Sequence, residues 1–347
     1  MARKARKKPA PPSPPGRLAY SPWQLPAAAW RQVAMRTWRE AGQDNISLVA
    51  AGVAFYGFLA IAPLLAAFVL AYGLAADPAR VVEDMRDLTA LMPADAAALI
   101  GEQLMAVVRT SAEKKGAGLF LALGLAVFGA RNGAAAIITA LNIAYEETET
   151  RNLLRTNLLA LAITVAALML GMLSLYAVAA LGHLERMLPE APSWLIAAGK
   201  IGAYALLLLA GAAGAATLYR YAPNRATARW VWLTPGSIGA ASLWLILTIG
   251  FGLYVSGFGN YGATYGSLSA VVVLLTWLYL SSYVLLLGAE LNSELEHQTA
   301  RDSTDGAPRP IGRRGAWVAD HVAGEDEPKG NAKRASPVSD RKAGKRG

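Results

Sequence analysis

The sequence has no cysteine, and it has few charged side chains. Zero cysteines exclude disulfides, thiolate nucleophiles and cysteine-based metal sites. Charged residues make up 16% of the 347-residue chain, well below the ~25% that soluble domains carry. A GxxxxGK[ST] phosphate-binding loop is also missing, so ATP hydrolysis by this chain is not expected. The shortage of charge points to an integral membrane protein.

Hydrophobic residues make up 54% of the chain, and they gather in long runs. A helix rises 1.5 Å per residue, so about 20 apolar residues cross the ~30 Å hydrocarbon core of a bilayer. We therefore predict an all-α fold, a polytopic six-helix transmembrane bundle formed by residues 30–297. The predicted spans cover residues 46–76, 116–145, 158–181, 201–219, 236–254 and 261–289.

The stretch 261–294 is the one around which the rest of the chain is organised. It carries no charge before Glu290, and Glu294 and Glu296 follow within two helical turns. An ionised carboxylate at the bilayer centre costs several kcal/mol. These glutamates are therefore predicted to mark the point where the last helix leaves the lipid.

The two ends of the chain are polar. Residues 1–29 are rich in Lys, Arg and Pro, and residues 298–347 mix charges with Pro and Gly. Such segments bury too little apolar surface to offset the entropy lost on ordering. We predict that both are disordered tails.

Two further segments show helical periodicity outside the spans. Residues 30–41 place Trp30, Val33 and Trp38 on one face and arginines mainly on the other. This pattern is typical of an amphipathic helix at the membrane interface, although the solvated face of a small cytoplasmic helix fits it too. Residues 77–115 predict two outer amphipathic helices, which either cap the bundle or cover an entrance to it.

The basic residues give the orientation. Six spans place both ends on one side, and the arginines of the short flanking segments fall on that side as well. Because Lys and Arg concentrate in cytoplasmic loops, both termini are predicted to be cytoplasmic. The net charge of +9 is then an orientation signal, and no specific nucleic acid is expected as a partner. Membrane lipids are the expected partners, and the oligomeric state stays open.

The predicted topology also argues against catalysis. It places His183 outside and both His297 and His321 inside, so no two histidines can share a metal. The acidic residues are scattered over loops and helix ends, whereas a two-metal nuclease needs a carboxylate cluster. No Asp or Glu lies in the middle of a span, which argues against proton coupling through such a group. We predict no metal, no cofactor and no enzymatic activity.

Arg131 is the charge that lies deepest in a predicted span. It lies ~22 Å from the outer boundary at residues 114–115, about two thirds of the way across the core. Its side chain either snorkels or packs against a helix end, or it lines a polar cavity with the neighbouring Asn132. Pro63, in the first span, predicts a kink, with a hinge as the alternative.

Uncharged polar residues could build a sodium or lipid site inside the bundle. Each of them could equally make a hydrogen bond between packed helices. The candidates are Asn132, Thr139, Asn260, Thr264 and Ser267.

Five stretches of the sequence form a set of motifs: AAGVAFYGFLAIAPLL at 50–65, GARNGAAAIITALNIAYEETETR at 129–151, YRYAPN at 219–224, the Trp-to-Pro-Gly step at 232–236 and the whole of 261–294. Together they resemble the YihY/BrkB family of membrane proteins. The resemblance covers about residues 30–297 and implies a six-span protein of the bacterial inner membrane with cytoplasmic ends. Family members have carried a ribonuclease label, a link to serum resistance and ties to lipid or solute export.

The resemblance also implies which positions carry the family motifs. These positions either bind a substrate or fix the fold, and they are Asn142, Tyr145, Glu149, Arg151, Tyr221, Pro223, Asn224, Tyr265, Gly266 and Glu290. We predict a transporter or exporter of a lipid or small solute. The alternative is an envelope scaffold or virulence factor that does not transport, and ribonuclease activity is not expected.

Overall fold

The computed structural model describes residues 14–72, 101, 117–187, 192–258 and 268–324. All regular elements in these ranges are helical. In chain order they are η1 (Pro22–Gln24), α1 (Ala27–Gln43), α2 (Ile46–Tyr72), α5 (Ala117–Ala144), α6 (Leu153–Met187), α7 (Ser193–Tyr221), α8 (Trp230–Phe258), α10 (Ser269–His297) and α11 (Trp317–Asp320). The all-α prediction is confirmed.

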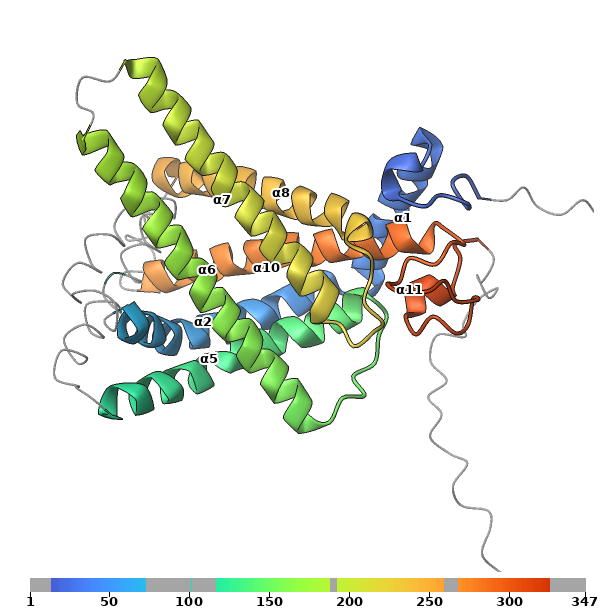
Figure 1. Cartoon of the computed structure of the whole chain (residues 1–347), viewed down its shortest axis with the longest axis horizontal. Coiled ribbons are helices and arrows are strands. Elements are labelled where there is room, and N and C mark those ends of the chain that lie inside the picture. Colours follow the sequence, from blue (N-terminus) through green and yellow to red (C-terminus); the bar gives the residue numbers. More distant parts are fainter. Residues whose placement is uncertain (1–13, 73–100, 102–116, 188–191, 259–267, 325–347) are drawn as a thin grey trace, which may run out of the picture.

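The long helices form one bundle, with α1 and α11 at the same end of it (Figure 1). Five helices contain stretches long and apolar enough to cross a membrane: Ile46–Phe68, Phe120–Ala144, Leu153–Leu173, Trp230–Val255 and Ser269–His297. A shorter apolar stretch, Ala205–Tyr221, lies in α7. In the described residues, each of the six predicted spans thus overlaps one of these helices, as a polytopic membrane protein requires.

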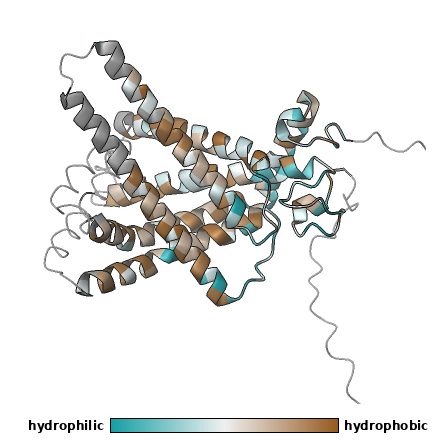
Figure 2. Ribbon diagram, in the orientation of Figure 1, coloured by the Kyte–Doolittle hydropathy of each residue, from teal (hydrophilic) through white to brown (hydrophobic). Residues whose placement is uncertain are grey.

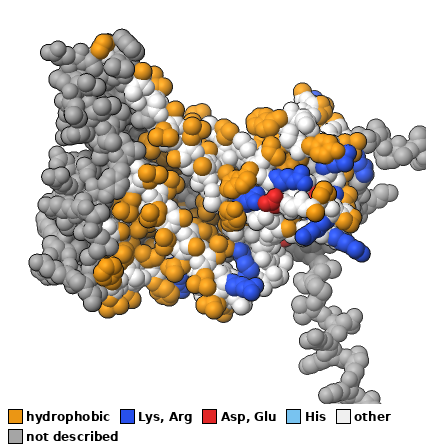
Figure 3. Space-filling model, viewed as in Figure 1, with side chains coloured by type: hydrophobic (Ala, Val, Ile, Leu, Met, Phe, Trp, Pro, Cys, Tyr) orange, Lys and Arg blue, Asp and Glu red, His pale blue; other side chains and the backbone are white. Residues whose placement is uncertain are grey.

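The surface of the bundle is apolar where the lipid would be. Hydrophobic residues cover the helices, and hydrophilic residues gather at the end that carries α1 and α11 (Figure 2). On the face shown in Figure 3, Lys and Arg side chains lie at this same end. Large side chains such as Leu121, Met169 and Leu253 are more than 60% exposed along the helices. Exposure of this kind is favourable only in a hydrocarbon solvent.

Helix α10 is the central element of the bundle. It packs against α8, α2, α1, α5 and α11. The helix continues past the predicted span to His297, and Glu290, Glu294 and Glu296 are at most 5% exposed. These glutamates, which were predicted to mark the point where the helix leaves the lipid, are covered by protein.

Pro63 lies at the closest contact between α2 and α5. A Cβ added to Gly129 would lie 3.1 Å from the Pro63 Cβ, and one added to Gly133 would lie 3.2 Å from the Ala60 Cβ. Small residues therefore let the two helices approach at the proline. Helix α2 runs through Pro63 without interruption, and a hinge there stays a prediction.

Helices α8 and α10 approach each other even more closely. A Cβ added to Gly288 would lie 2.7 Å from the Gly236 carbonyl oxygen, so neither glycine has room for a side chain. Helix α8 begins at Trp230, six residues before the start of the predicted span, and includes Pro235. Beside that proline the Gly236 N–H donates to Asn292 Oδ1 at 2.8 Å, and Asn292 Nδ2 donates to the Leu233 carbonyl at 3.1 Å. Asn292 thus joins the two helices where the proline interrupts the hydrogen-bond pattern.

The prediction of a disordered chain after His297 is wrong for residues 298–324. This segment, which we call the folded tail, contains α11 and covers the ends of the bundle helices. Gln298, Thr299 and Ser303 are fully buried in it. Residues 14–29, also predicted to be disordered, contain η1 and the start of α1. Composition misses both segments because specific contacts to the rest of the protein hold them, both in a small apolar cluster with Trp232 and Leu295 and through buried polar groups.

The remaining predictions fall outside the described residues. They concern the amphipathic segment 77–115, whose only described position is Gly101, and the candidate positions Asn260, Thr264, Tyr265, Gly266 and Ser267. The extreme ends, residues 1–13 and 325–347, also lie outside the described ranges.

Candidate functional site

Motif residues of the α5–α6 loop and the α7–α8 loop form hydrogen bonds with one another at the end of the bundle. Asn142, at the end of α5, donates to Glu149 Oε2 at 3.0 Å and accepts the Asn224 backbone N–H at 2.7 Å. Arg151 donates to the Glu149 carboxylate from Nε at 2.8 Å and from Nη2 at 2.6 Å. It also donates to the Ala222 carbonyl. These contacts, which we call the loop lock, join the α5–α6 loop to the α7–α8 loop.

Electrostatics stabilise the same contacts. The hydrogen bond from Arg151 lowers the pKa of Glu149 to about 2, against a partial opposing effect of burial. A bidentate arginine–carboxylate pair favours the ionised acid in this way. Asn224 completes the connection by donating to the Thr148 carbonyl at 2.7 Å and to Thr150 Oγ1 at 2.8 Å. Every polar group involved has a protein partner, which is the pattern of a structural lock.

A second polar contact lies directly beneath these loops. Arg225 Nη2 donates to Glu296 Oε2 at 2.6 Å, and Ser303 Oγ donates to the same oxygen at 2.7 Å. The Arg225 guanidinium lies 4.9 Å from the centre of the Tyr145 ring, and Tyr145 belongs to the main apolar cluster. Tyr145 therefore supports the ion pair from inside the bundle.

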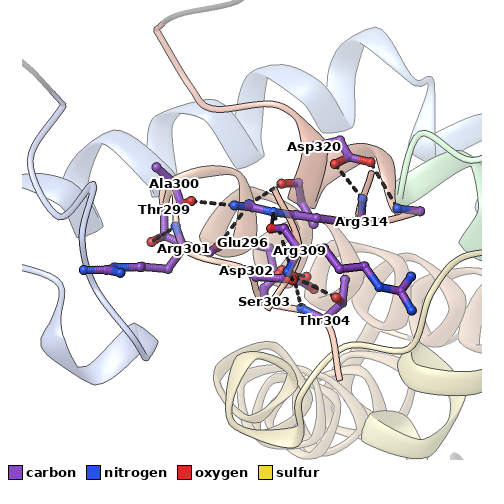
Figure 4. Close-up of polar contacts among 12 residues, drawn as sticks. Glu296, Thr299, Ala300, Arg301, Asp302, Ser303, Thr304, Arg309, Arg314 and Asp320 are labelled. Atoms are coloured by element: carbon purple, nitrogen blue, oxygen red, sulfur yellow. Dashed lines mark hydrogen bonds and ion pairs between the residues drawn. The ribbon is translucent and has the colours of Figure 1, made fainter. Parts of the chain in front are cut away.

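Arg314 organises the folded tail, as Figure 4 shows. It is 4% exposed, and its guanidinium donates to the carbonyls of Ala319 at 2.6 Å, Ala300 at 2.8 Å and Arg309 at 3.1 Å. Asp320 accepts backbone N–H bonds from the 312–315 turn, including that of Arg314 at 3.0 Å. One buried cation thus satisfies carbonyls that would otherwise be unpaired.

The folded tail also reaches the loop at the end of α5. The Trp317 backbone N–H donates to Glu147 Oε1 at 2.7 Å. The Trp317 ring lies between two histidines, 5.5 Å from the His297 ring and 4.4 Å from the His321 ring, measured between centroids. His297 and His321, which are far apart in the sequence, are therefore neighbours here with an indole between them.

Three carboxylates that we predicted to be scattered are in fact close together. One carboxylate oxygen from each of Glu40, Asp44 and Glu146 lies within 4.8 Å of the others. Glu40 and Asp44 come from the α1–α2 corner, and Glu146 comes from the turn after α5. This cluster could not be predicted from the sequence, because the two segments are about a hundred residues apart and neither contains a metal-binding motif.

An apolar cavity of about 860 Å³ opens among the helices of the bundle. Residues of α7, α8 and α10 form most of its wall, including Gly211, Ala240, Trp244, Leu253 and Val284. Trp244 is 36% exposed and Leu253 is 68% exposed, so the cavity opens to the lipid-facing surface. A mainly apolar hollow of this size suits a small or chain-like hydrophobic ligand.

Indole N–H groups donate hydrogen bonds to hydroxyl groups of the cavity wall. Trp244 Nε1 donates to Ser281 Oγ at 3.0 Å, and Trp277 Nε1 lies 3.4 Å from Thr248 Oγ1. Ala240 lies ten residues after the start of α8, which corresponds to about 15 Å along the helix.

Other predicted candidates lie away from the cavity. Arg131 Nη1 donates to Asn157 Oδ1 at 2.8 Å, one turn after the start of α6, and the guanidinium lies 4.4 Å from the Phe128 ring centroid. This arrangement matches packing near a helix end rather than a polar cavity. Asn132 is exposed, and Thr139 Oγ1 donates to the Ala135 carbonyl of its own helix.

Tyr221 lies outside the contacts that join the two loops, beside Trp230. Its ring packs edge-on against Trp230, with the centroids 6.2 Å apart, and it is 47% exposed. Arg220 lies 4.8 Å from the Trp230 ring centroid. Aromatic and basic side chains of this kind anchor helix ends at the headgroup level.

Four residues of the loop lock, Asn142, Glu149, Arg151 and Asn224, are motif positions. A family profile described as "Virulence factor BrkB" matches residues 37–311. The chain belongs to the BrkB family. The family resemblance noted from the sequence is thereby confirmed, and the BrkB profile ends inside the folded tail, at residue 311.

Curated relatives of this BrkB protein are membrane proteins of bacteria. It is 31% identical to the "Putative ribonuclease-like protein YfkH" of Bacillus subtilis over 49% of this chain and 62% of the relative. It is 39% identical to a "UPF0761 membrane protein" of Tolumonas auensis over 28% of this chain and 32% of the relative. The chain thus matches less than two thirds of the length of these relatives. No solved structure is significantly similar to it.

Proposed function

We propose that this protein binds a membrane lipid in the apolar cavity between α7, α8 and α10 and moves it across the bilayer without ATP hydrolysis. The carrying observation is the cavity itself, with its volume of about 860 Å³ and its exposed rim at Trp244 and Leu253. An acyl chain could enter from the surrounding lipid without crossing a polar barrier. A charged solute would lose its hydration there without compensation.

The proposal includes the setting of the protein. It lies in the bacterial inner membrane with the loop lock, the folded tail and both termini on the cytoplasmic side. Support comes from the arginines Arg151, Arg220 and Arg225, which lie at the same end of the bundle as the folded tail. The loop lock then holds the cytoplasmic ends of the helices while lipid occupies the cavity on the membrane side.

We also propose that the protein acts without catalysis. The name of the Bacillus relative includes the word "ribonuclease-like". The cavity gives little support for such an activity, because its wall is formed by apolar residues and a few hydroxyl groups. A nuclease site needs groups that bind phosphate and activate water.

The proposal can be tested with a substitution that fills the cavity, at a position where a side chain has room. Gly252 lines it, and no atom lies within 4 Å of a Cβ added there. Gly250, two residues away on α8, has the same free space but is not part of the wall. Gly252→Trp should slow transbilayer movement of a fluorescent phospholipid in reconstituted liposomes several-fold, whereas Gly250→Trp should keep the rate of the unmodified protein.

Lipid that copurifies with the protein gives an independent readout. Native mass spectrometry of the detergent-purified protein should show bound phospholipid, and Gly252→Trp should lower its occupancy relative to Gly250→Trp. Equal lipid occupancy and equal translocation rates for the two variants would contradict the proposal.

A further inference from the structure

A second pocket lies at the corner between α1 and α2, and we call it the corner pocket. Its volume is about 600 Å³, and its wall is formed by α1, the start of α2 and the middle of α10. The apolar stretch Ile46–Phe68 begins at this corner, so the pocket lies where α2 enters the hydrocarbon. The residues that line it include Trp38, Gly42, Ser47, Leu48, Tyr279 and Tyr283.

The wall of the corner pocket carries a pair of hydroxyl groups. Ser47 Oγ and Tyr279 Oη lie 2.7 Å apart and share one hydrogen bond, in which either atom can be the donor. Each hydroxyl has one O–H to donate. The pair therefore keeps one O–H for an acceptor in the pocket, and the oxygens of a phosphodiester are acceptors of this kind.

The edge of the corner pocket continues into the lipid-facing surface of α2. Trp38 and Leu48, which line the pocket, are 72% and 74% exposed. Leu48 shares a face of α2 with Phe55 and Leu59, which follow at helical spacing and are each 54% exposed. In a bilayer, such an apolar helix face is covered by acyl chains. The occupant that reaches the pocket along this face is therefore a membrane lipid.

The charges beside the pocket favour a phosphate. Arg31 is exposed on the same face of α1 as Trp38, two helical turns earlier. Basic side chains at the membrane surface attract the phosphates of lipid headgroups. The acids of the corner, Glu40 and Asp44, are not among the residues that line the pocket.

Helix α10 separates the corner pocket from the apolar cavity. Tyr279 and Tyr283, which line the corner pocket, are four residues apart and share one face of the helix. Ser281 lies between them in the sequence, points to the opposite face and lines the cavity. A lipid in one site therefore does not occupy the other.

We propose that the corner pocket binds the headgroup of one glycerophospholipid, independently of what the cavity binds. The phosphodiester accepts a hydrogen bond from the pair Ser47 and Tyr279, and an acyl chain follows the exposed face of α2 past Leu48. The bound lipid fills the space between α1, α2 and α10. It is a structural ligand of the bundle, so the proposal goes beyond the movement of lipid through the cavity.

The proposal can be tested with one variant that fills the pocket and one that removes a hydroxyl. Gly42 lines the pocket, and a Cβ added there meets no atom within 4 Å, so Gly42→Trp has room for its side chain. Its control is Gly239→Trp, at a glycine with the same free space that lines neither pocket. Tyr279→Phe removes the hydroxyl and keeps the ring. Its control is Tyr56→Phe, at an exposed tyrosine of α2 outside both pockets.

Native mass spectrometry of the full-length protein in detergent, after removal of copurified lipid, measures the binding. Dioctanoyl phosphatidylglycerol should bind about tenfold more tightly than dioctanoylglycerol, which has the same chains and no phosphate. Gly42→Trp should weaken its binding about tenfold and Tyr279→Phe several-fold, whereas both controls should bind like the unmodified protein. An excess of inorganic phosphate should not displace the lipid, because inorganic phosphate has no acyl chain to place along α2.

Each measurement is repeated with Gly252→Trp added, which fills the cavity. If the cavity binds no lipid, Gly252→Trp changes nothing, and the loss caused by Gly42→Trp still reports on the corner pocket. Equal Tm values of each variant and its control without lipid show that a loss of binding is not a loss of folding. The proposal is overturned if dioctanoylglycerol binds as tightly as dioctanoyl phosphatidylglycerol, if inorganic phosphate displaces the lipid, or if Gly42→Trp and Tyr279→Phe bind the lipid like their controls.

Discussion

Arg225 and Glu296 form an ion pair that is closed off from solvent. Their side chains are 1% and 0% exposed, and Nη2 lies 2.6 Å from Oε2. Arg225 belongs to the α7–α8 loop, Glu296 lies in the last turn of α10, and Ser303 of the folded tail donates to the same carboxylate oxygen. The α7–α8 loop, the end of α10 and the folded tail therefore depend on one buried pair.

Removal of either partner should destabilise the protein severely. Arg225→Ala leaves the Glu296 carboxylate buried without its counter-charge, and breaking a buried pair in this way costs about 3–5 kcal/mol. Unfolding followed by tryptophan fluorescence in detergent would measure the loss. The matched control is Asp305→Ala, which removes an acid that is 58% exposed from its pair with Arg220 and should cost far less, because water screens an exposed ion pair. Similar losses for the two variants would contradict this assignment.

Gly236→Ala, which adds only a Cβ, should strongly lower the stability of the bundle. The new Cβ would overlap the Gly288 carbonyl oxygen and the Asn292 side chain, and the backbone of a packed helix cannot move aside cheaply. We expect a loss of about 3 kcal/mol or more in the free energy of unfolding.

A nearby glycine provides the control for this substitution. Gly239 is on the same helix, and a Cβ added there meets no atom within 4 Å. Gly239→Ala should be neutral or stabilise the helix by up to about 1 kcal/mol. If Gly236→Ala and Gly239→Ala unfold at the same temperature, α8 and α10 are not in backbone contact at this point.

The membrane helices could be predicted because their signal is local. A long run without charge, such as 46–72, is stable in lipid as a helix, because a helix makes all its backbone hydrogen bonds internally. Helix ends were harder to place, because polar residues continue a helix beyond the hydrocarbon. Helix α10 therefore runs to His297 rather than ending near residue 289.

The polar contacts could not be predicted, since they join distant segments. Nothing in the sequence around Arg225 points to Glu296, and nothing around Glu40 points to Glu146. The motif positions Asn142, Glu149 and Arg151 were found through a family resemblance, and only the structure shows that they bond to one another and to the α7–α8 loop. Composition predicts whether a segment can bury apolar surface, but it does not detect a segment held by buried polar groups.

Arg314→Ala should release the folded tail while the bundle stays folded. The substitution leaves the carbonyls of Ala300, Ala319 and Arg309 without their donor, and each unsatisfied buried group costs about 1–3 kcal/mol. Limited proteolysis with thermolysin should cut between residues 298 and 324 faster, and far-UV circular dichroism should change little. Arg313→Ala, at the exposed neighbouring position, should keep the protease resistance of the unmodified protein. Equal cleavage of both variants would show that Arg314 does not hold the tail.

The loop lock should weaken in acid through Glu149. The hydrogen bond from Arg151 lowers the pKa of this carboxyl from 4.5 to about 2 in the folded protein. A group whose pKa is lowered by folding binds more protons in the unfolded state, so its stabilising effect is full above pH 4.5 and is lost as the pH falls toward 2. Glu149→Gln should therefore lower the Tm at pH 7, and the difference from the unmodified protein should shrink steadily between pH 4.5 and 2.5. Comparison of the two proteins at each pH cancels the acid effects that they share. A difference in Tm that stays constant down to pH 2.5 would mean that the ionised carboxylate of Glu149 contributes nothing to the joining of the two loops.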